Sequence, residues 1–137
     1  AGLASQLGGA FLIGFSQSGT YPIEAAMQNP ESVKGIVLLE TASCRFYWED
    51  DQLDVFATIP ILFVYGDHLV DAYDGNWETY SLVCEALAQQ INDAGGNARM
   101  TRLPELGIFG NSHMLMQDRN NREVADLIMD WIEENVR

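Results

Sequence analysis

The sequence predicts an α/β fold in which helices cover both faces of a mostly parallel sheet. Two runs, residues 33–39 and 59–65, are rich in β-branched residues and almost entirely apolar, which is typical of strands buried on both faces. A segment with apolar residues at helical spacing, residues 77–94, follows the second of these runs. A third apolar run meets the residues GFSQSG and then another helix-like segment. Alternation of this kind favours parallel strands joined by crossover helices.

Four strands are predicted in chain order. The first begins at Ala10 and gives way to glycines and serines after Ile13. The third has Pro60 near its beginning, where a missing N–H donor is tolerated. The last, with the sequence ARMTRL, alternates polar with apolar residues, as an edge strand does. The predicted strands are residues 10–13, 33–39, 59–65 and 98–103.

Helices are predicted from apolar spacing and from stop signals. Residues 1–8 are typical of the end of a helix that is C-capped near Gly8 or Gly9. The segment behind GFSQSG is helix-like up to Asn29-Pro30. Residues 42–58 show no regular period and are predicted to form a loop. The other predicted helices are residues 77–94, stopped by two glycines, and residues 121–136, which close the domain.

Length and charge limit the class of protein. The 137 residues are expected to form a single domain, residues 1–137. The net charge of −13 disfavours binding to nucleic acid and to anionic membranes, and no apolar run is long enough to cross a bilayer. Cys44 and Cys84 allow at most one disulfide and provide no zinc motif. Because the chain starts at Ala1 without Met, we expect it to be a piece of a longer protein.

Ser16 lies in the pattern G-x-S-x-S-G, at the turn between the first strand and the helix after it. This is the spacing of a nucleophile elbow, G-x-S-x-G, except that Ser18 replaces the last glycine and Gly19 follows it. Such a turn exposes the serine hydroxyl and directs the N–H of the next residue, Gln17, at a developing oxyanion. A phosphate-binding loop and a plain turn remain alternatives, although residues 1–29 contain no Lys or Arg.

A serine nucleophile needs a base and an orienting acid, and the chain offers both. His113 lies in a glycine-rich loop between the last strand and the last helix, whereas His68 follows the third strand directly. Glu40 ends the second strand, at the sheet edge where open α/β folds carry their sites. In this fold class the serine, the acid and the histidine usually follow one another in this order along the chain. If Glu40 is the acid, either histidine fits this order. Only His113 leaves room for Asp67 or Asp71 as the acid.

Other residues bear on metal binding and on substrate binding. Asp67, Asp71 and Asp74 suggest a calcium loop, but the matching register of an EF-hand puts apolar residues at two ligand positions, so no metal site is predicted. His68 is expected to be a loop histidine satisfied locally. The apolar residues 114–116 beside His113 are expected either to line an acyl pocket or to belong to the core.

The motifs GFSQSG, IPILFVYGDH and GIFGNSHMLMQDRNN resemble those of the α/β-hydrolase superfamily, and more narrowly a group of bacterial esterases with S-Q-S-G, G-D-H and G-N-S-H in this order. The resemblance covers nearly the whole chain but only the second half of that fold. It implies that Ser16 is the nucleophile, that His113 is the general base and then acid, and that the backbone N–H of Gln17 is one oxyanion donor. The second donor is implied to precede Ala1, so that the fragment by itself is expected to be inactive.

The resemblance leaves the triad carboxylate between two positions. The commoner hydrolase arrangement implies Asp67 or Asp71, after the third strand. The narrower esterase group has a glutamate after the strand that follows the nucleophile helix, which is Glu40 here, and this position is favoured.

The resemblance also implies the reaction: hydrolysis of small-molecule carboxylic esters through an acyl-enzyme, without a cofactor or metal, in a secreted or periplasmic protein. The alternatives are an inactive or fragmentary scaffold, another chemistry of this fold such as that of a lyase or thioesterase, and a phosphate- or flavin-binding domain. The ester itself and the oligomeric state do not follow from the sequence.

Overall fold

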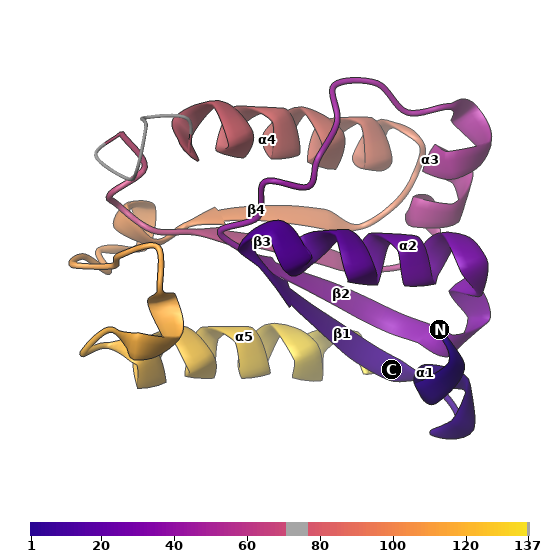
Figure 1. The fold of residues 1–137 in the computed structure, drawn as a ribbon, viewed down its shortest axis with the longest axis horizontal. Coiled ribbons are helices and arrows are strands. Elements are labelled where there is room, and N and C mark those ends of the chain that lie inside the picture. Colours follow the sequence, from indigo (N-terminus) through magenta and orange to yellow (C-terminus); the bar gives the residue numbers. More distant parts are fainter. Residues whose placement is uncertain (71–76, 137) are drawn as a thin grey trace.

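A computed structural model describes residues 1–70 and 77–136 and shows one four-stranded parallel sheet in the order β1-β2-β3-β4 (Figure 1). The predicted α/β class with a parallel sheet is therefore confirmed. The strands lie close to their predicted positions, with β1 two residues longer and β3 two residues shorter at its start. They are β1 (Ala10–Phe15), β2 (Val33–Leu39), β3 (Ile61–Tyr65) and β4 (Ala98–Arg102).

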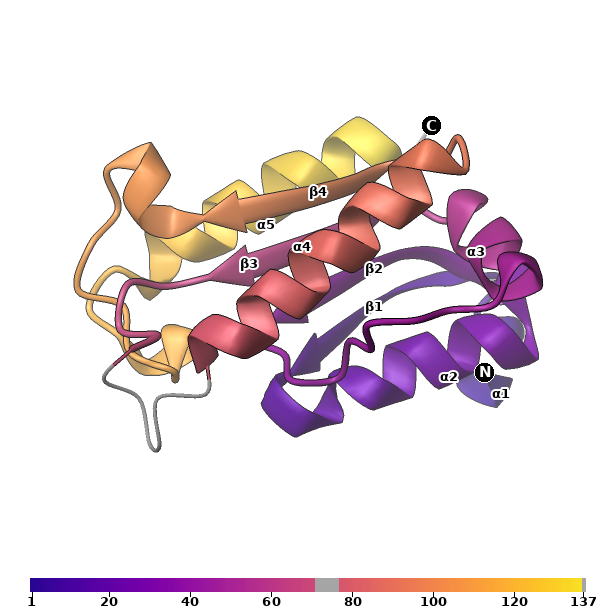
Figure 2. The same ribbon diagram turned by 90° about the horizontal axis from the view of Figure 1, so that it is seen from above.

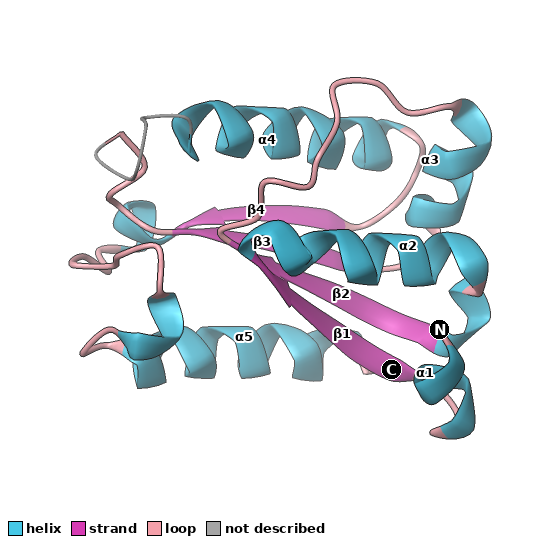
Figure 3. Ribbon diagram, viewed as in Figure 1, coloured by secondary structure: helices cyan, strands magenta, loops and turns pink. Residues whose placement is uncertain are grey.

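Helices cover both faces of the sheet, as the sequence predicts (Figures 1 and 3). One face carries α2 (Thr20–Gln28), α3 (Asp50–Ala57) and α4 (Trp77–Asp93). The other face carries α5 (Asn121–Asn135). A short N-terminal helix, α1 (Gly2–Gln6), ends before Gly8 and Gly9, which both have positive φ. Short 3-10 turns occupy residues 16–19, 30–32, 103–106 and 115–117.

The two central strands hold the core together because alternate side chains enter different apolar clusters. Ile36 and Phe63 belong to the cluster under α2, α3 and α4, whereas Val37 and Leu62 belong to the cluster with α5. All residues of β3 are buried, and β2 is buried except at Lys34. Strands buried on both faces in this way explain the continuous apolar runs in the sequence.

The outer strands are more exposed. The strand β4 pairs with β3 and is an edge strand of the described sheet, as its alternating sequence predicts. The strand β1 lies at the opposite edge, and Ile13 within it is 58% exposed.

The prediction of a loop over residues 42–58 is wrong for its second half, which forms α3. Two acidic residues in its first turn, Asp50 and Asp51, suit the positive end of the helix dipole. The Gln52 side chain accepts a hydrogen bond from the backbone N–H of Glu49 at 3.2 Å, which is half of a capping box. With Phe56 fully buried on its inner side, this helix is amphipathic but too short to show a clear period.

A disulfide joins Cys44, in the segment that follows β2, to Cys84 in α4. It links two parts of the chain that are 40 residues apart. The chain therefore forms the single bridge that its two cysteines allow.

The carboxyl ends of the four strands lie at one edge of the sheet (Figure 2). Ser16, Glu40 and Gly66 each come directly after a strand at this edge. Parallel neighbours bring such positions together although they are far apart in sequence. Among the described residues, no helix is long and apolar enough to cross a membrane.

Candidate active site

Ser16 lies in a strained turn directly after β1. Its φ of 53° is in the left-handed region, which costs a non-glycine residue about 1–2 kcal/mol. The turn is tight, because a Cβ added to Gly14 would lie 2.7 Å from the Cα of Gly19. Ser18, at the position where the motif has glycine, is exposed, and its hydroxyl donates to the carbonyl of Phe15 at 2.6 Å. Serine is thus compatible with this position, and Gly19 makes the close approach to Gly14.

Glu40 follows β2 and is only 2% exposed. Its φ of 44° is also in the left-handed region. The oxygen Oε1 accepts a hydrogen bond from the backbone N–H of Gly66 at 2.5 Å. A Cβ on Gly66 would lie 3.2 Å from this oxygen and 2.9 Å from the Cβ of Asn111, so glycine lets the carboxylate approach the backbone.

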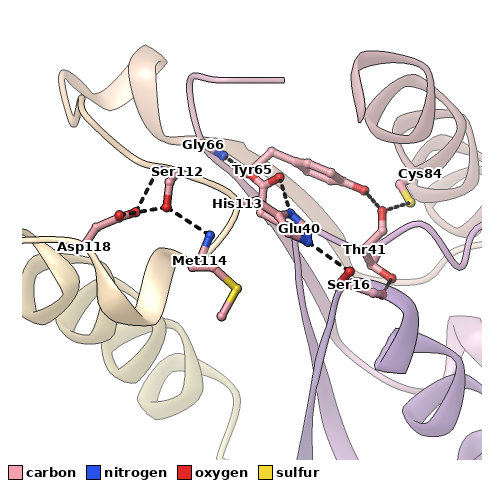
Figure 4. A network of polar contacts seen from close by, with 10 residues as sticks. All are labelled: Ser16, Glu40, Thr41, Tyr65, Gly66, Cys84, Ser112, His113, Met114 and Asp118. Carbon is pink, nitrogen blue, oxygen red and sulfur yellow. Dashed lines mark hydrogen bonds and ion pairs between the residues drawn. The ribbon is translucent and has the colours of Figure 1, made fainter. Parts of the chain in front are cut away.

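The imidazole of His113 lies between Glu40 and Ser16 (Figure 4). Its Nε2 is 2.9 Å from the hydroxyl oxygen of Ser16, and its Nδ1 is 3.4 Å from Oε2 of Glu40. The ring also contacts two aromatic rings, with centroid distances of 4.8 Å to Phe15 and 4.4 Å to Trp77. Polar contacts at both nitrogens and the contacts with these two rings hold the imidazole in one orientation.

Asp67 holds the loop that carries His113. Its carboxylate accepts hydrogen bonds from the backbone N–H groups of Gly110 at 2.9 Å and of Asn111 at 2.6 Å. Partial burial acts to raise the pKa of Asp67, but these hydrogen bonds outweigh it and lower the pKa. The carboxylate therefore anchors the loop in its charged form.

A second acid fixes the residue next to His113. The carboxylate of Asp118 accepts hydrogen bonds from both the backbone N–H and the hydroxyl of Ser112, each at 2.8 Å. The Ser112 hydroxyl in turn accepts from the backbone N–H of Met114 at 3.1 Å. These contacts explain why the serine of G-N-S-H and the aspartate five residues after the histidine occur in one motif.

Burial governs the charge of the pair formed by Glu40 and His113. It raises the pKa of Glu40 from 4.5 to about 7, and the nearby carboxylates of Asp67 and Asp118 add to this, while the N–H of Gly66 opposes it. Burial also lowers the pKa of His113. A neutral imidazole beside a serine hydroxyl is the protonation state that a general base requires.

A hollow of about 340 Å³ opens above the serine. Three of its lining residues, Ala42, Trp77 and Tyr80, were not identified from the sequence as site residues. The aromatic residues lie in the first turn of α4, where they also belong to the apolar face of that helix, so no sequence signal separated them from the core. The residues that line the hollow are Ser16, Gln17, Ala42, Trp77, Tyr80 and His113.

The apolar residues 114–116 do not line this hollow. Leu115 is 1% exposed and belongs to the core on the α5 side, whereas Met116 is 42% exposed. Of the two expectations for this segment, a place in the core is met by Leu115.

The other histidine and the alternative acids are placed differently. The His68 side chain is 54% exposed, and its Nε2 lies 3.7 Å from Oδ2 of Asp67. Asp71 and Asp74 lie outside the described residues. In the described ranges 1–70 and 77–136, no group of three or more His, Cys, Asp or Glu side chains could hold a metal ion.

Serine, histidine and glutamate side chains meet at the carboxyl edge of a parallel sheet. This arrangement resembles that of esterases of the α/β-hydrolase type. The solved structure of a bacterial esterase matches 99% of this chain with 41% sequence identity and a TM-score of 0.89. A probable secreted lipase phiG from Fungal sp. (strain ATCC 74256) is 36% identical over 47 residues, which are 34% of this chain. No family model matches the chain.

These similarities confirm the resemblance to α/β-hydrolase-like esterases. The chain spans 41% of the bacterial esterase and its match covers 13% of the lipase, less than half the length of either relative.

Proposed function

We propose that this chain carries the catalytic residues of a carboxylic ester hydrolase that works through an acyl-enzyme, and that residues 1–137 form part of one α/β-hydrolase domain. Ser16 is the nucleophile, His113 is the general base and then acid, and Glu40 orients His113. The observation that carries the proposal is the unbroken contact from Glu40 through His113 to Ser16, with distances of 3.4 and 2.9 Å.

The chemistry follows from this contact. Nε2 of His113 takes the proton of the Ser16 hydroxyl as its oxygen attacks the ester carbonyl. Glu40 keeps the proton on Nδ1, so that Nε2 presents its lone pair, and its charge stabilises the imidazolium that forms. The imidazolium then protonates the leaving alcohol, and water, deprotonated by the same nitrogen, releases the acid.

The developing oxyanion needs hydrogen-bond donors, and the N–H of Gln17 is the donor that we assign. Gln17 is the second residue of the 3-10 turn 16–19, where N–H groups have no acceptor within the turn. It lines the same hollow as Ser16 and His113. One donor of this kind contributes about 10²–10³-fold to kcat.

Glu40 is a better candidate for the orienting acid than Asp67. The carboxylate of Glu40 faces Nδ1 of His113, whereas that of Asp67 receives two backbone N–H groups of the loop. Small-molecule esters are the proposed substrates, because the chain is similar to an esterase and to a probable lipase.

The test is hydrolysis of p-nitrophenyl butyrate by the longest natural form of the chain, with Ser16→Ala compared against Ser18→Ala. Ser18 is a matched control, because it is an exposed serine of the same turn with its hydroxyl on a backbone carbonyl. We expect Ser16→Ala to lose at least about 10⁴-fold in kcat and to lose labelling by a fluorophosphonate. Equal labelling of the wild type and Ser16→Ala would refute the proposal, as would a wild-type protein that neither labels nor hydrolyses the ester.

A further inference from the structure

Thr41 directly follows Glu40 and is fully buried. Its hydroxyl donates to the carbonyl oxygen of Ser16 at 3.0 Å and accepts from the backbone N–H of Ser43 at 3.2 Å. Its own carbonyl accepts from the hydroxyl of Tyr65 at 2.6 Å (Figure 4). Thr41 thus connects the ends of β2 and β3 with the serine turn after β1.

The hydrogen bond to Ser16 determines where the next N–H points. The carbonyl of Ser16 and the N–H of Gln17 belong to one planar trans peptide unit, in which the C=O and N–H bonds point in opposite directions. When the hydroxyl of Thr41 holds the carbonyl on one side, the N–H of Gln17 is directed to the other side. Gln17 lines the hollow together with Ser16 and His113.

We propose that Thr41 is a positioning residue whose hydroxyl aims the N–H of Gln17 at the oxyanion of the reaction. The inference rests on the proposed esterase function and assigns a role to a residue that does not touch the substrate. Glu40 and its neighbour Thr41 then act from one strand end on two parts of the reaction, the imidazole and the oxyanion donor.

A second observation supports the same role. A Cβ added to Gly19 would collide with the hydroxyl of Thr41, so the glycine of the turn leaves the space that this hydroxyl occupies. Ser16 also has the strained φ of 53°, and a peptide unit in such a turn needs an external contact to keep one orientation.

Ser43 offers a matched control. Its hydroxyl donates to the carbonyl of Gln17 at 3.3 Å. This carbonyl belongs to the next peptide unit, which contains the N–H of Ser18 and not that of Gln17. Removing this hydroxyl also removes a polar contact from the turn, but it leaves the unit with the proposed oxyanion donor unchanged.

The experiment compares Thr41→Val, Thr41→Ser and Ser43→Ala in the longest natural form of the chain, with p-nitrophenyl butyrate as the probe. We expect Thr41→Val to lower kcat by roughly 10–100-fold, below the full loss of an oxyanion donor, with KM within about twofold. Thr41→Ser keeps the hydroxyl and should remain within about threefold of the wild type, as should Ser43→Ala.

A crystal structure of Thr41→Val provides the second measurement. It should show the peptide unit between Ser16 and Gln17 rotated, with the N–H turned away from the hollow. A unit in the wild-type orientation would overturn the inference, whatever the activity. So would a rotated unit with wild-type kcat, or a loss in Ser43→Ala equal to that in Thr41→Val. If the wild type hydrolyses no ester, the proposed function fails, and the structure of the variant alone decides whether Thr41 positions the turn.

Discussion

Replacing Glu40 with Gln should make the protein more stable and far less active. The side chain keeps its size, and its carbonyl oxygen still accepts from the N–H of Gly66. The amide, however, donates to Nδ1 of His113 and leaves Nε2 protonated, so that the base is in the wrong tautomer. We expect kcat to fall by about 10⁴-fold, as it does when an orienting acid loses its charge.

The gain in stability follows from the pKa of Glu40. Folding raises it from 4.5 to about 7, so at pH 8 the folded protein holds a buried charge at a cost of about 3 kcal/mol. At low pH the carboxyl is protonated in both folded and unfolded states, and the cost disappears. As pH rises from 4.5 to about 7, the unfolded chain releases its proton first, and the wild type therefore loses stability relative to the variant.

Urea unfolding of both proteins at pH 5 and pH 8 measures this effect. The difference in free energy of unfolding between Glu40→Gln and the wild type should grow by roughly 2–3 kcal/mol in favour of the variant between these pH values. A difference that does not change with pH would refute the raised pKa. Near-normal kcat in the variant would refute the role of Glu40 and leave Asp67 or Asp71 as the acid.

Three further predictions concern the pH profile, the disulfide and the loop of His113. The kcat/KM of the wild type should fall as pH drops through about 7, because the first proton bound by the pair of Glu40 and His113 removes the base. A pH profile of kcat/KM that stays flat down to pH 5 would contradict this. Replacing Cys44 and Cys84 with Ala should lower the free energy of unfolding in urea by up to about 4 kcal/mol, because the bridge closes a loop between residues 40 positions apart. An unchanged free energy of unfolding would show that the bridge does not restrain the unfolded chain. Asp67→Asn should lower kcat/KM by about tenfold by loosening the loop, against at least about 10³-fold if Asp67 were the orienting acid.

The fold could be predicted because its central strands are unambiguous. A strand buried on both faces requires an unbroken apolar run, and β2 and β3 provide such runs. The apolar period does not predict the helix α3, because this helix has only eight residues with two aspartates at its start. In a helix this short, the capping pattern of Glu49 and Gln52 is a stronger signal than the period.

The meeting of Ser16 and Glu40 also follows from topology. The strands β1 and β2 are parallel neighbours, with Phe15 opposite Leu39, so the residues that follow them lie side by side. His113 is 97 positions from Ser16, and its loop follows the last strand, which puts it at the same edge of a parallel sheet. Trp77 had no such support, because an aromatic residue on the apolar face of a helix is the same in sequence whether it packs on the core or on an imidazole.

The choice between Glu40 and Asp67 shows what a sequence leaves undetermined. Both follow buried strands and lie at the same sheet edge, so position alone does not separate them. In the structure their carboxylates have different contacts: Oε2 of Glu40 lies 3.4 Å from Nδ1 of His113, whereas Asp67 accepts backbone N–H groups of the His113 loop. A non-glycine residue with a left-handed backbone is strained. Such strain at Ser16 and Glu40 persists only where surrounding contacts hold the residue in place. Thr41 provides such a contact for Ser16, and Gly66 leaves the space in which the carboxylate of Glu40 approaches the backbone, so the exchange of either should disturb the geometry of the site before it disturbs the fold.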